Sequence, residues 1–468
     1  MKNLHYTLRL PFAFTFLIVL SSFKLQPATS NKYFVTNQTE LASAIGKSVP
    51  GDIITMKNGV WNNIDIVFKG VGSENRPITL KAETAGQVII SGSSSLRLSG
   101  EYLIVDGLNF KNGHSSRNFH LIEFKDGKIP ANHCRITNIS VSRFNKEDGT
   151  DTWVGFYGKH NRVDHSLFEG KVSKSVLMIV WRSTPEADYH RIDHNHFKDI
   201  PSIGNGGAIA IRIGDGTQAL SSSVTTVESN IFENMLGIGK IINIKSSGNI
   251  IRGNTFIKAS GSICLRHGDN NLIEGNYILP GLRDNYTGGI LVIGENHIIR
   301  HNYIQGTRRK GKPAIVLYEG DANNYQGKGS YYPTKNILIE NNTLVDNDKN
   351  ILIGQIGQVY DKPGTEMTVP VENITYKKNV IVGNNTVTPL IEILDKPKGK
   401  IIYEGNLFFN GNSNGLENIP GISIKDPLLT LGADSIYHYN ANSPLKSNIL
   451  APPLKRNEVG PTWMRISN

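Results

Sequence analysis

The chain has 468 residues, and 50 Lys and Arg against 40 Asp and Glu give it a formal net charge of +10. This basic balance suits an acidic partner, which could be nucleic acid, a membrane surface or an acidic glycan, and no nucleic-acid-binding motif is present. Cys134 and Cys264 are the only cysteines, so the sequence excludes a disulfide framework, and we expect two buried thiols.

The N-terminal segment has the layout of a secretory signal peptide. Lys2 and Arg9 precede an apolar run over 10–20, and small and polar residues follow up to Ser30. The run is too short for a spanning helix, and no later stretch is apolar enough to cross a membrane. We therefore predict that residues 1–30 are a signal peptide and that the protein is secreted or periplasmic. Export favours an acidic glycan over nucleic acid as the partner.

Residues 37–45, NQTELASAI, predict a short helix at the start of the folded chain. Asn37 is an N-cap residue, and Glu40 stands three positions later, where it completes a capping box. The apolar stripe of this helix consists of Leu41, Ala44 and Ile45. A strand is expected over 53–56. The helix would cover the open end of a stack of strands, whose edges would otherwise be exposed.

A short repeat runs through most of the chain. Two polar residues, an Asn and an apolar pair recur every 22 to 40 residues, with a basal period of 22 to 26. Such a period with occasional insertions is typical of a solenoid whose coils carry loops of variable length. The marker residues are Asn195, Asn230, Asn254, Asn276, Asn302, Asn342, Asn379 and Asn406.

Short β-branched runs and abundant Gly favour strands over helices between these markers. We therefore predict an all-β fold, a single right-handed parallel β-helix over 31–410 with an N-terminal capping helix. Residues 411–468 lose the repeat, and we expect a loop-rich C-terminal extension packed on the β-helix.

The expected strands end in a series of cations. When the strands are aligned on their apolar alternation, their last residues are Arg182, Arg212, Lys245, Arg266, Ile293 and Tyr318. Like charges at opposed strand positions repel, so a groove that binds a chain of carboxylates explains four cations in register. A solvated basic face is the alternative. Lys245 and Arg266 are about one coil apart, so we expect them on neighbouring strands, roughly 5 Å apart.

These residues suit β-elimination of a polyuronate. In that reaction a base removes the proton at C5, an acid protonates the leaving glycosidic oxygen, and a metal or cations neutralise the carboxylate. Neighbouring cations lower the pKa of a Lys, which makes Lys245 the candidate base. An Arg is a poor proton donor, so Arg266 would chiefly stabilise charge, assisted by Tyr318 or a water.

The segment 241–268, IINIKSSGNIIRGNTFIKASGSICLRHG, resembles the core of polysaccharide lyase family 6, which comprises alginate lyases and chondroitinase B. Its Lys-Ser pair at Lys245 matches the family's Brønsted base, and its RHG triplet at Arg266 matches the proposed acid. The segment 204–214, GNGGAIAIRIG, resembles the Gly-rich strand one coil earlier, which implies that Arg212 approaches the substrate. The resemblance implies a lyase that acts on alginate, because alginate lyases dominate the family.

The sequence departs from the family at its calcium site. Calcium-dependent members carry two Glu residues, seven and five positions before the catalytic Lys, and Ile238 and Lys240 stand there in this chain. An Ile and a Lys cannot ligate calcium. We therefore predict no metal and no other cofactor, with the Lys240 ammonium in place of the ion. Loss of the activity, leaving a glycan binder, is the opposing interpretation.

Several further residues are candidates for contact with the acidic polysaccharide. His267 either bonds the substrate or orients Arg266, and Glu319 either contacts substrate or pairs with an Arg. The predicted substrate-binding set is Lys240, Arg212, His267, Tyr318, Glu319 and Arg182.

Other functions stay open at this point. A dermatan sulfate or chondroitin lyase would use the same chemistry, and a uronate C5-epimerase would return the proton from the other face. A non-catalytic acidic-glycan binder would need no base and acid pair. Hydrolysis by paired carboxylates would need Asp residues where the strands end in cations.

Overall fold

The computed structural model describes residues 30–173, 175–201, 209–236, 240–280, 287–308, 312–323, 331–356, 366–445 and 450–465. The predicted signal peptide, apart from Ser30, and Ile238 lie outside the described residues. In the described parts of the chain, no helix combines the length and apolarity needed to cross a membrane.

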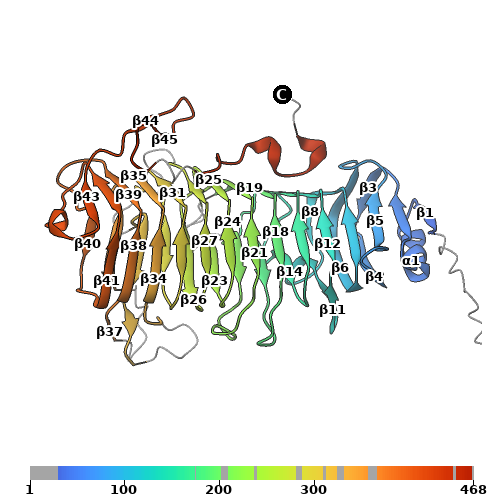
Figure 1. The fold of residues 1–468 in the computed structure, drawn as a ribbon. Helices are drawn as coiled ribbons and strands as arrows, with labels where there is room; N and C mark the ends of the chain where they lie inside the picture. Colours follow the sequence, from blue (N-terminus) through green and yellow to red (C-terminus); the bar gives the residue numbers. More distant parts are fainter. Residues whose placement is uncertain are drawn as a thin grey trace, which may run out of the picture.

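The strands wind into a right-handed parallel β-helix with three faces, which confirms the predicted fold (Figure 1). We call the faces A, B and C. Face A contains β1 (Lys32–Val35), β2 (Ile53–Met56), β5 (Ile78–Ala82), β7 (Leu103–Asp106), β12 (Arg135–Thr137), β15 (Arg162–Asp164), β18 (Arg191–Asp193), β21 (Thr226–Glu228), β24 (Ile250–Arg252), β27 (Leu272–Glu274), β30 (Ile298–Arg300), β34 (Lys335–Glu340), β38 (Glu372–Lys377) and β41 (Lys398–Glu404).

Faces B and C are joined by the long strand β6 (Val88–Glu101), which pairs in both. Face B contains β3 (Gly59–Asn62), β8 (Leu108–Ser115), β13 (Ser140–Ser142), β16 (Leu167–Glu169), β19 (His196–Ile200), β22 (Ile231–Met235), β25 (Thr255–Ile257), β28 (Tyr277–Ile278), β31 (Tyr303–Gln305), β35 (Thr343–Asn347), β39 (Val380–Gly383), β42 (Asn406–Phe409) and β43 (Ile422–Ile424).

Face C carries the candidate site. It contains β4 (Asp65–Val71), β9 (His120–Glu123), β14 (Thr152–Phe156), β17 (Met178–Val180), β20 (Ile211–Ile213), β23 (Lys240–Lys245), β26 (Ser262–His267), β29 (Ile290–Val292), β32 (Ile315–Tyr318), β36 (Ile351–Gln355) and β40 (Ile391–Ile393). Short strands attached to this framework are β10 (Lys125–Asp126), β11 (Ile129–Asn132), β33 (Gly320–Asp321), β37 (Met367–Val369), β44 (Leu429–Leu431) and β45 (Tyr437–Tyr439).

Helix α1 (Gln38–Lys47) covers the N-terminal end of the β-helix, as predicted (Figure 1). The Asn37 side chain accepts a hydrogen bond from the Glu40 backbone N–H at 3.0 Å. The Glu40 carboxylate accepts from the backbone N–H of Thr36 at 2.7 Å, one residue earlier than a capping box requires. The predicted apolar stripe is buried, which removes the exposed end of the core from water.

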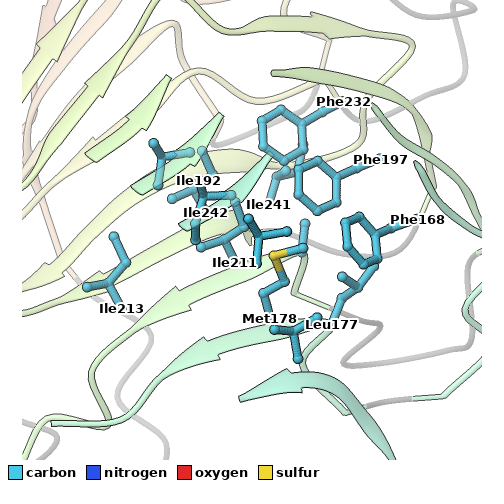
Figure 2. Close-up of a cluster of buried hydrophobic side chains, with 14 of the residues drawn as sticks. Phe168, Leu177, Met178, Ile192, Phe197, Ile211, Ile213, Phe232, Ile241 and Ile242 are labelled. Carbon is cyan, nitrogen blue, oxygen red and sulfur yellow. The ribbon is translucent and has the colours of Figure 1, made fainter. Parts of the chain in front are cut away.

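The interior consists of stacked side chains of the same kind. Phe168, Phe197, Phe232 and Phe256 stack with ring centroids 4.8 to 5.5 Å apart, and three of these rings are visible beside Ile and Met side chains in Figure 2. Each buried side chain of this size contributes about 1.5–3 kcal/mol by leaving water. The core thus grows by one layer per coil, as a solenoid requires.

The eight marker Asn residues form a buried ladder at the turn from face A to face B. From Asn230 onward, each Oδ1 accepts a hydrogen bond from the backbone N–H of the marker Asn one coil earlier, at 2.9 to 3.1 Å. The Oδ1 of Asn195 accepts from the backbone N–H of Ser166 at 3.1 Å. Each Nδ2 donates to a strand carbonyl of the preceding coil, for example Asn254 to Val227 at 3.0 Å. Because buried amides cost free energy when unpaired, the repeat identifies positions that the fold needs.

The C-terminal residues form two further structures. The coil repeat continues past residue 410 to β43, which pairs with β42. Residues 450–465, with the 3-10 helices η3 (Arg456–Glu458) and η4 (Thr462–Met464), then run back along the β-helix toward its N-terminal end (Figure 1). We call this segment the strap. Its contacts are Leu454 with Thr255, Arg456 with Glu233, Gly460 with His194, and Thr462 and Trp463 with Asn138.

Candidate functional site

The register of face C shows which side chains follow the same paired position. Val180, Ile213 and Ile244 are in register on successive strands and point into the core. The residues that follow them are Trp181, Gly214 and Lys245. The predicted register of four cations is therefore wrong at Arg182 and Arg212, and a bulge also offsets Arg266 from Lys245. Each Arg was aligned as the last residue of its strand, although the core side chains fix the register elsewhere.

Arg182 comes one residue too late to share that position. Its side chain is buried, and its guanidinium pairs with the Asp188 carboxylate and bonds the Ser221 hydroxyl at 2.7 Å. The prediction that Arg182 belongs to the series of accessible cations is thus wrong, because this guanidinium stabilises the loop after β17.

Arg212 lies two residues before the predicted position, opposite Asn243 of the next strand. Side chains alternate along a strand, so Arg212 still points outward on the same face as Lys245. The Nε of Arg212 and the Oδ1 of Asn243 are buried, and neither has a hydrogen-bond partner among the described residues. Buried atoms of this kind are expected where a ligand completes the hydrogen bonds.

A β-bulge separates Lys245 from Arg266. Ile244 pairs with Leu265, whereas Lys245 pairs with His267, so Arg266 is the extra residue of β26. Bulges redirect a side chain out of the regular strand. The Arg266 guanidinium accordingly lies over the ring of Tyr331, 4.0 Å from its centroid. The expectation that Lys245 and Arg266 are on neighbouring strands is confirmed, but they are not directly opposed.

Lys245 has the environment of a base. Burial, then the charges of Arg212, Arg266 and Lys240, lower its pKa from the ordinary value of 10.5 to about 8. Each cation disfavours a second positive charge nearby, and burial removes the water that would solvate it. Lys245 thus loses its proton within the range in which enzymes work.

Tyr318 and Glu319 continue the site along the β-helix. Burial, chiefly, raises the pKa of Tyr318, whose ring stacks on Tyr331 at 6.2 Å between centroids. Burial and the carboxyl group of Asp395 raise the pKa of Glu319 to about 7. The neighbour that the structure gives Glu319 is thus an Asp, and not the Arg that the sequence analysis offered.

His267 is buried at the end of β26, and its ring meets Tyr332 edge to face at 5.8 Å between centroids. Its backbone lies opposite Lys245, directly after Arg266. His267 therefore lies at the strand end that carries Arg266, opposite Lys245.

The calcium positions of the resembling family do not fit a metal here. Lys240 stands at one of them, and its ammonium is close enough to Lys245 to lower the pKa of that residue. Within the described parts of the chain, no three His, Cys, Asp or Glu side chains gather as metal ligands would. An ammonium group therefore stands where calcium-dependent members place a carboxylate ligand, and an ammonium cannot coordinate a metal ion.

Sequence reasoning missed the aromatic side chains around these cations. Tyr331 and Tyr332 follow a long insertion after β33, so local spacing does not connect them to the site. An alignment on the strand ends selects Arg182 and so misses its neighbour Trp181. An alignment on the inward-pointing Val180 would have revealed Trp181.

A parallel β-helix that carries a Lys of lowered pKa among cations on one face has the architecture expected of a lyase that acts on acidic polysaccharides. Residues 35–442 match the family model described as chondroitinase B. The chain therefore belongs to the chondroitinase B family, polysaccharide lyase family 6, and the predicted family is confirmed.

Solved structures agree with this assignment. An alginate lyase of the family, AlyGC in an arginine-to-alanine mutant form, is 32% identical with a TM-score of 0.84, over 93% of this chain and 59% of that one. This chain thus spans about three fifths of the AlyGC chain. A mannuronic-acid-specific family 6 lyase from human gut microbiota is 26% identical (TM-score 0.74; 93% and 97% covered). A family 6 lyase from Pseudopedobacter saltans is 28% identical (TM-score 0.71; 92% and 99% covered). No curated protein sequence matches the chain.

Proposed function

We propose that the protein is a lyase that cleaves alginate by β-elimination, with Lys245 as the base that removes the C5 proton. The observation that carries this proposal is the half-buried Lys245 amine, whose pKa is lowered to about 8 by burial and then by three neighbouring cations. About a tenth of such an amine is neutral at pH 7, and the same cations attract and neutralise a uronate carboxylate.

Arg266 and Tyr318 divide the remaining work. Arg266 stabilises the charge that develops on the substrate, because a guanidinium is a poor proton donor. Tyr318 keeps its proton, since burial raises its pKa, so its hydroxyl donates a hydrogen bond to the leaving glycosidic oxygen while a water molecule supplies the proton. The aromatic contacts of both residues with Tyr331 hold them in place.

Lys240 takes the role of the calcium ion found in other members. Its ammonium lies on β23 with Lys245 and offers a fixed positive charge for the carboxylate next to C5. Catalysis then needs no metal, and the fixed cation keeps the pKa of Lys245 low. Abolition of activity by a chelator would contradict this role.

The test follows ultraviolet absorbance of the unsaturated product during incubation with alginate. Wild-type protein should raise the absorbance equally with and without EDTA, and Lys245→Ala should not raise it. Lys240→Met should lose most activity, whereas Lys258→Met, on a solvent-exposed turn, should retain it.

Dermatan sulfate is the second candidate substrate, because the matching family model is described as chondroitinase B. If the absorbance stays constant with alginate but rises with dermatan sulfate, dermatan sulfate is the substrate and the same mechanism applies to it. Two flat traces would favour a C5-epimerase or a glycan binder. We further propose that the protein acts outside the cytoplasm, where such polymers occur.

A further inference from the structure

An aromatic cluster lies on face C two or more coils before Lys245, and nothing in the mechanism above uses it. Trp181 is at its centre, with Tyr157 stacked one coil earlier at 6.4 Å and Phe119 at 5.9 Å between ring centroids. The indole N–H of Trp181 donates a hydrogen bond to the Nε2 of His120 at 3.1 Å. We call Phe119, His120, Tyr157 and Trp181 the aromatic cluster.

Local sequence makes room for this cluster. His120 is 1% exposed, and a Cβ on Gly155 would lie 2.7 Å from its Nε2, so only glycine lets the imidazole lie against β14. Burial lowers the pKa of His120 to about 3, which keeps the ring neutral. Its Nε2 is then a permanent acceptor for Trp181, since an indole N–H can only donate.

The cluster ends on Arg212. The Arg212 guanidinium carbon is 5.8 Å from the ring centroid of Trp181, within the range of a cation–π contact. The next coil carries Gly214 where Trp181 and Lys245 stand on their strands, so no side chain of that residue separates the guanidinium from Lys245. Among the neighbouring charges, Arg212 has the largest effect on the pKa of Lys245.

We propose that Trp181 and His120 are positioning residues that hold the Arg212 guanidinium beside Lys245, where it binds a uronate carboxylate of the substrate. The buried Nε of Arg212 is without an acceptor among the described residues, and the Asn243 amide lies opposite on the next strand. A uronate carboxylate would accept a hydrogen bond from this Nε, in the geometry that guanidinium favours. A hydroxyl group of the same sugar would donate to the Asn243 Oδ1. This inference rests on the proposed function for its substrate class.

The test is a double-mutant cycle with Trp181→Leu and Arg212→Met. Each single variant should raise KM for alginate oligomers by about tenfold. A tenfold change corresponds to roughly 1.4 kcal/mol, which is within the range of a partly desolvated cation–π pair. Because Trp181 acts through Arg212, the double variant should be no worse than Arg212→Met alone. Additive losses would overturn the proposal, since Trp181 would then act on substrate or fold by itself.

The pH profile separates positioning from simple damage to the fold. Loss of the fixed Arg212 charge should move the titration of Lys245 to higher pH in Trp181→Leu, while Arg266, Lys240 and Cys264 still surround the amine. Trp181→Phe keeps a ring under the guanidinium and should keep the wild-type profile. An unchanged profile in Trp181→Leu would overturn the proposal. Phe34→Leu, at an exposed ring on β1, is the matched control.

A readout without turnover keeps this inference distinct from the proposed function. In the Lys245→Ala background, calorimetry should show the same non-additive loss of affinity for an alginate oligomer. If wild-type protein cleaves neither polymer but this loss is present, the carboxylate site stands and the lyase proposal fails. If wild-type protein cleaves alginate and Trp181→Leu binds the oligomer normally, the carboxylate site fails and the lyase proposal stands.

Discussion

The turn from face A to face B and the outward ends of the face C strands recur together along the β-helix, but they differ in composition. The first carries an Asn at each of eight coils, bonded to the next by the same pair of hydrogen bonds. The second carries Trp181, Gly214, Lys245 and a bulged Arg266 on four successive coils. Repetition marks the positions that hold coils together, whereas the positions that we propose to act on substrate do not repeat.

The largest expected effect comes from a substitution at the outward end of a face C strand, which leaves the Asn ladder intact. Lys245→Met should reduce cleavage of alginate by about 10³-fold, because the reaction loses its general base. Its far-ultraviolet circular dichroism should match the wild-type spectrum. Retention of more than a tenth of the activity would assign the base to another group.

A substitution in the Asn ladder should have the opposite pattern, with a loss of stability and no loss of activity. Asn254→Leu should lower the free energy of unfolding by roughly 2–5 kcal/mol, because buried partners such as the Val227 carbonyl lose their hydrogen bonds. Denaturant unfolding measures this loss, with exposed Asn384→Leu as the control. Turnover per folded molecule should stay at the wild-type value, and a fall in it would couple the two regions.

The pH dependence of turnover sharpens the contrast. Only neutral Lys245 can accept the C5 proton, so kcat should rise about tenfold from pH 6 to 7 and level off above the pKa near 8. Stopped assays across this range measure the rising limb of the plot of kcat against pH. A limb near pH 10 would mean that the cations do not act on Lys245.

Stability should show the cost of the same amine. The folded pKa of Lys245 lies below its unfolded value, so the unfolded chain binds more protons between about pH 8 and 10.5, and stability rises with pH there. Lys245→Met should therefore raise Tm at pH 7, and its advantage should shrink as the pH rises toward 10. A constant difference in Tm would separate the activity effect from this linkage.

The fold was predictable because the ladder Asn residues recur once per coil, so their spacing in the sequence equals the coil length. Asn, Gly and β-branched residues recur at spacings that count coils, and the cap at α1 obeys local rules. The sequence pointed most directly to Lys245 and Arg266, where a family motif extends over one coil. Register errors of one or two residues misplaced Arg182 and Arg212, since apolar alternation does not reveal which residue a turn takes up.

The remaining parts of the site come from long-range contacts. Tyr331 reaches Arg266 after an insertion, and Asp395 reaches Glu319 from two coils further on. The bulge at Arg266 depends on the pairing of two strands and not on either sequence alone. These contacts follow from the assembled β-helix, so a single sequence shows no local signal for them.

The smallest expected effect concerns the strap. Arg456→Ala should lower the free energy of unfolding by about 0.5–1 kcal/mol, because its bidentate pair with Glu233 is largely exposed to solvent. Chemical denaturation of matched samples measures this difference. A loss of several kcal/mol would show that the strap supports many coils through this one contact.

The strap also changes how the molecule can come apart. Coils that touch only their neighbours can fray one after another from either end. Hydrogen bonds from Thr462 and Trp463 to Asn138 join residues 324 and 325 positions apart. Residues 462 and 463 thereby fasten coils formed early in the chain, so the coils between them must be synthesised before these hydrogen bonds can form. Unfolding of the coils that the strap contacts then requires release of the strap.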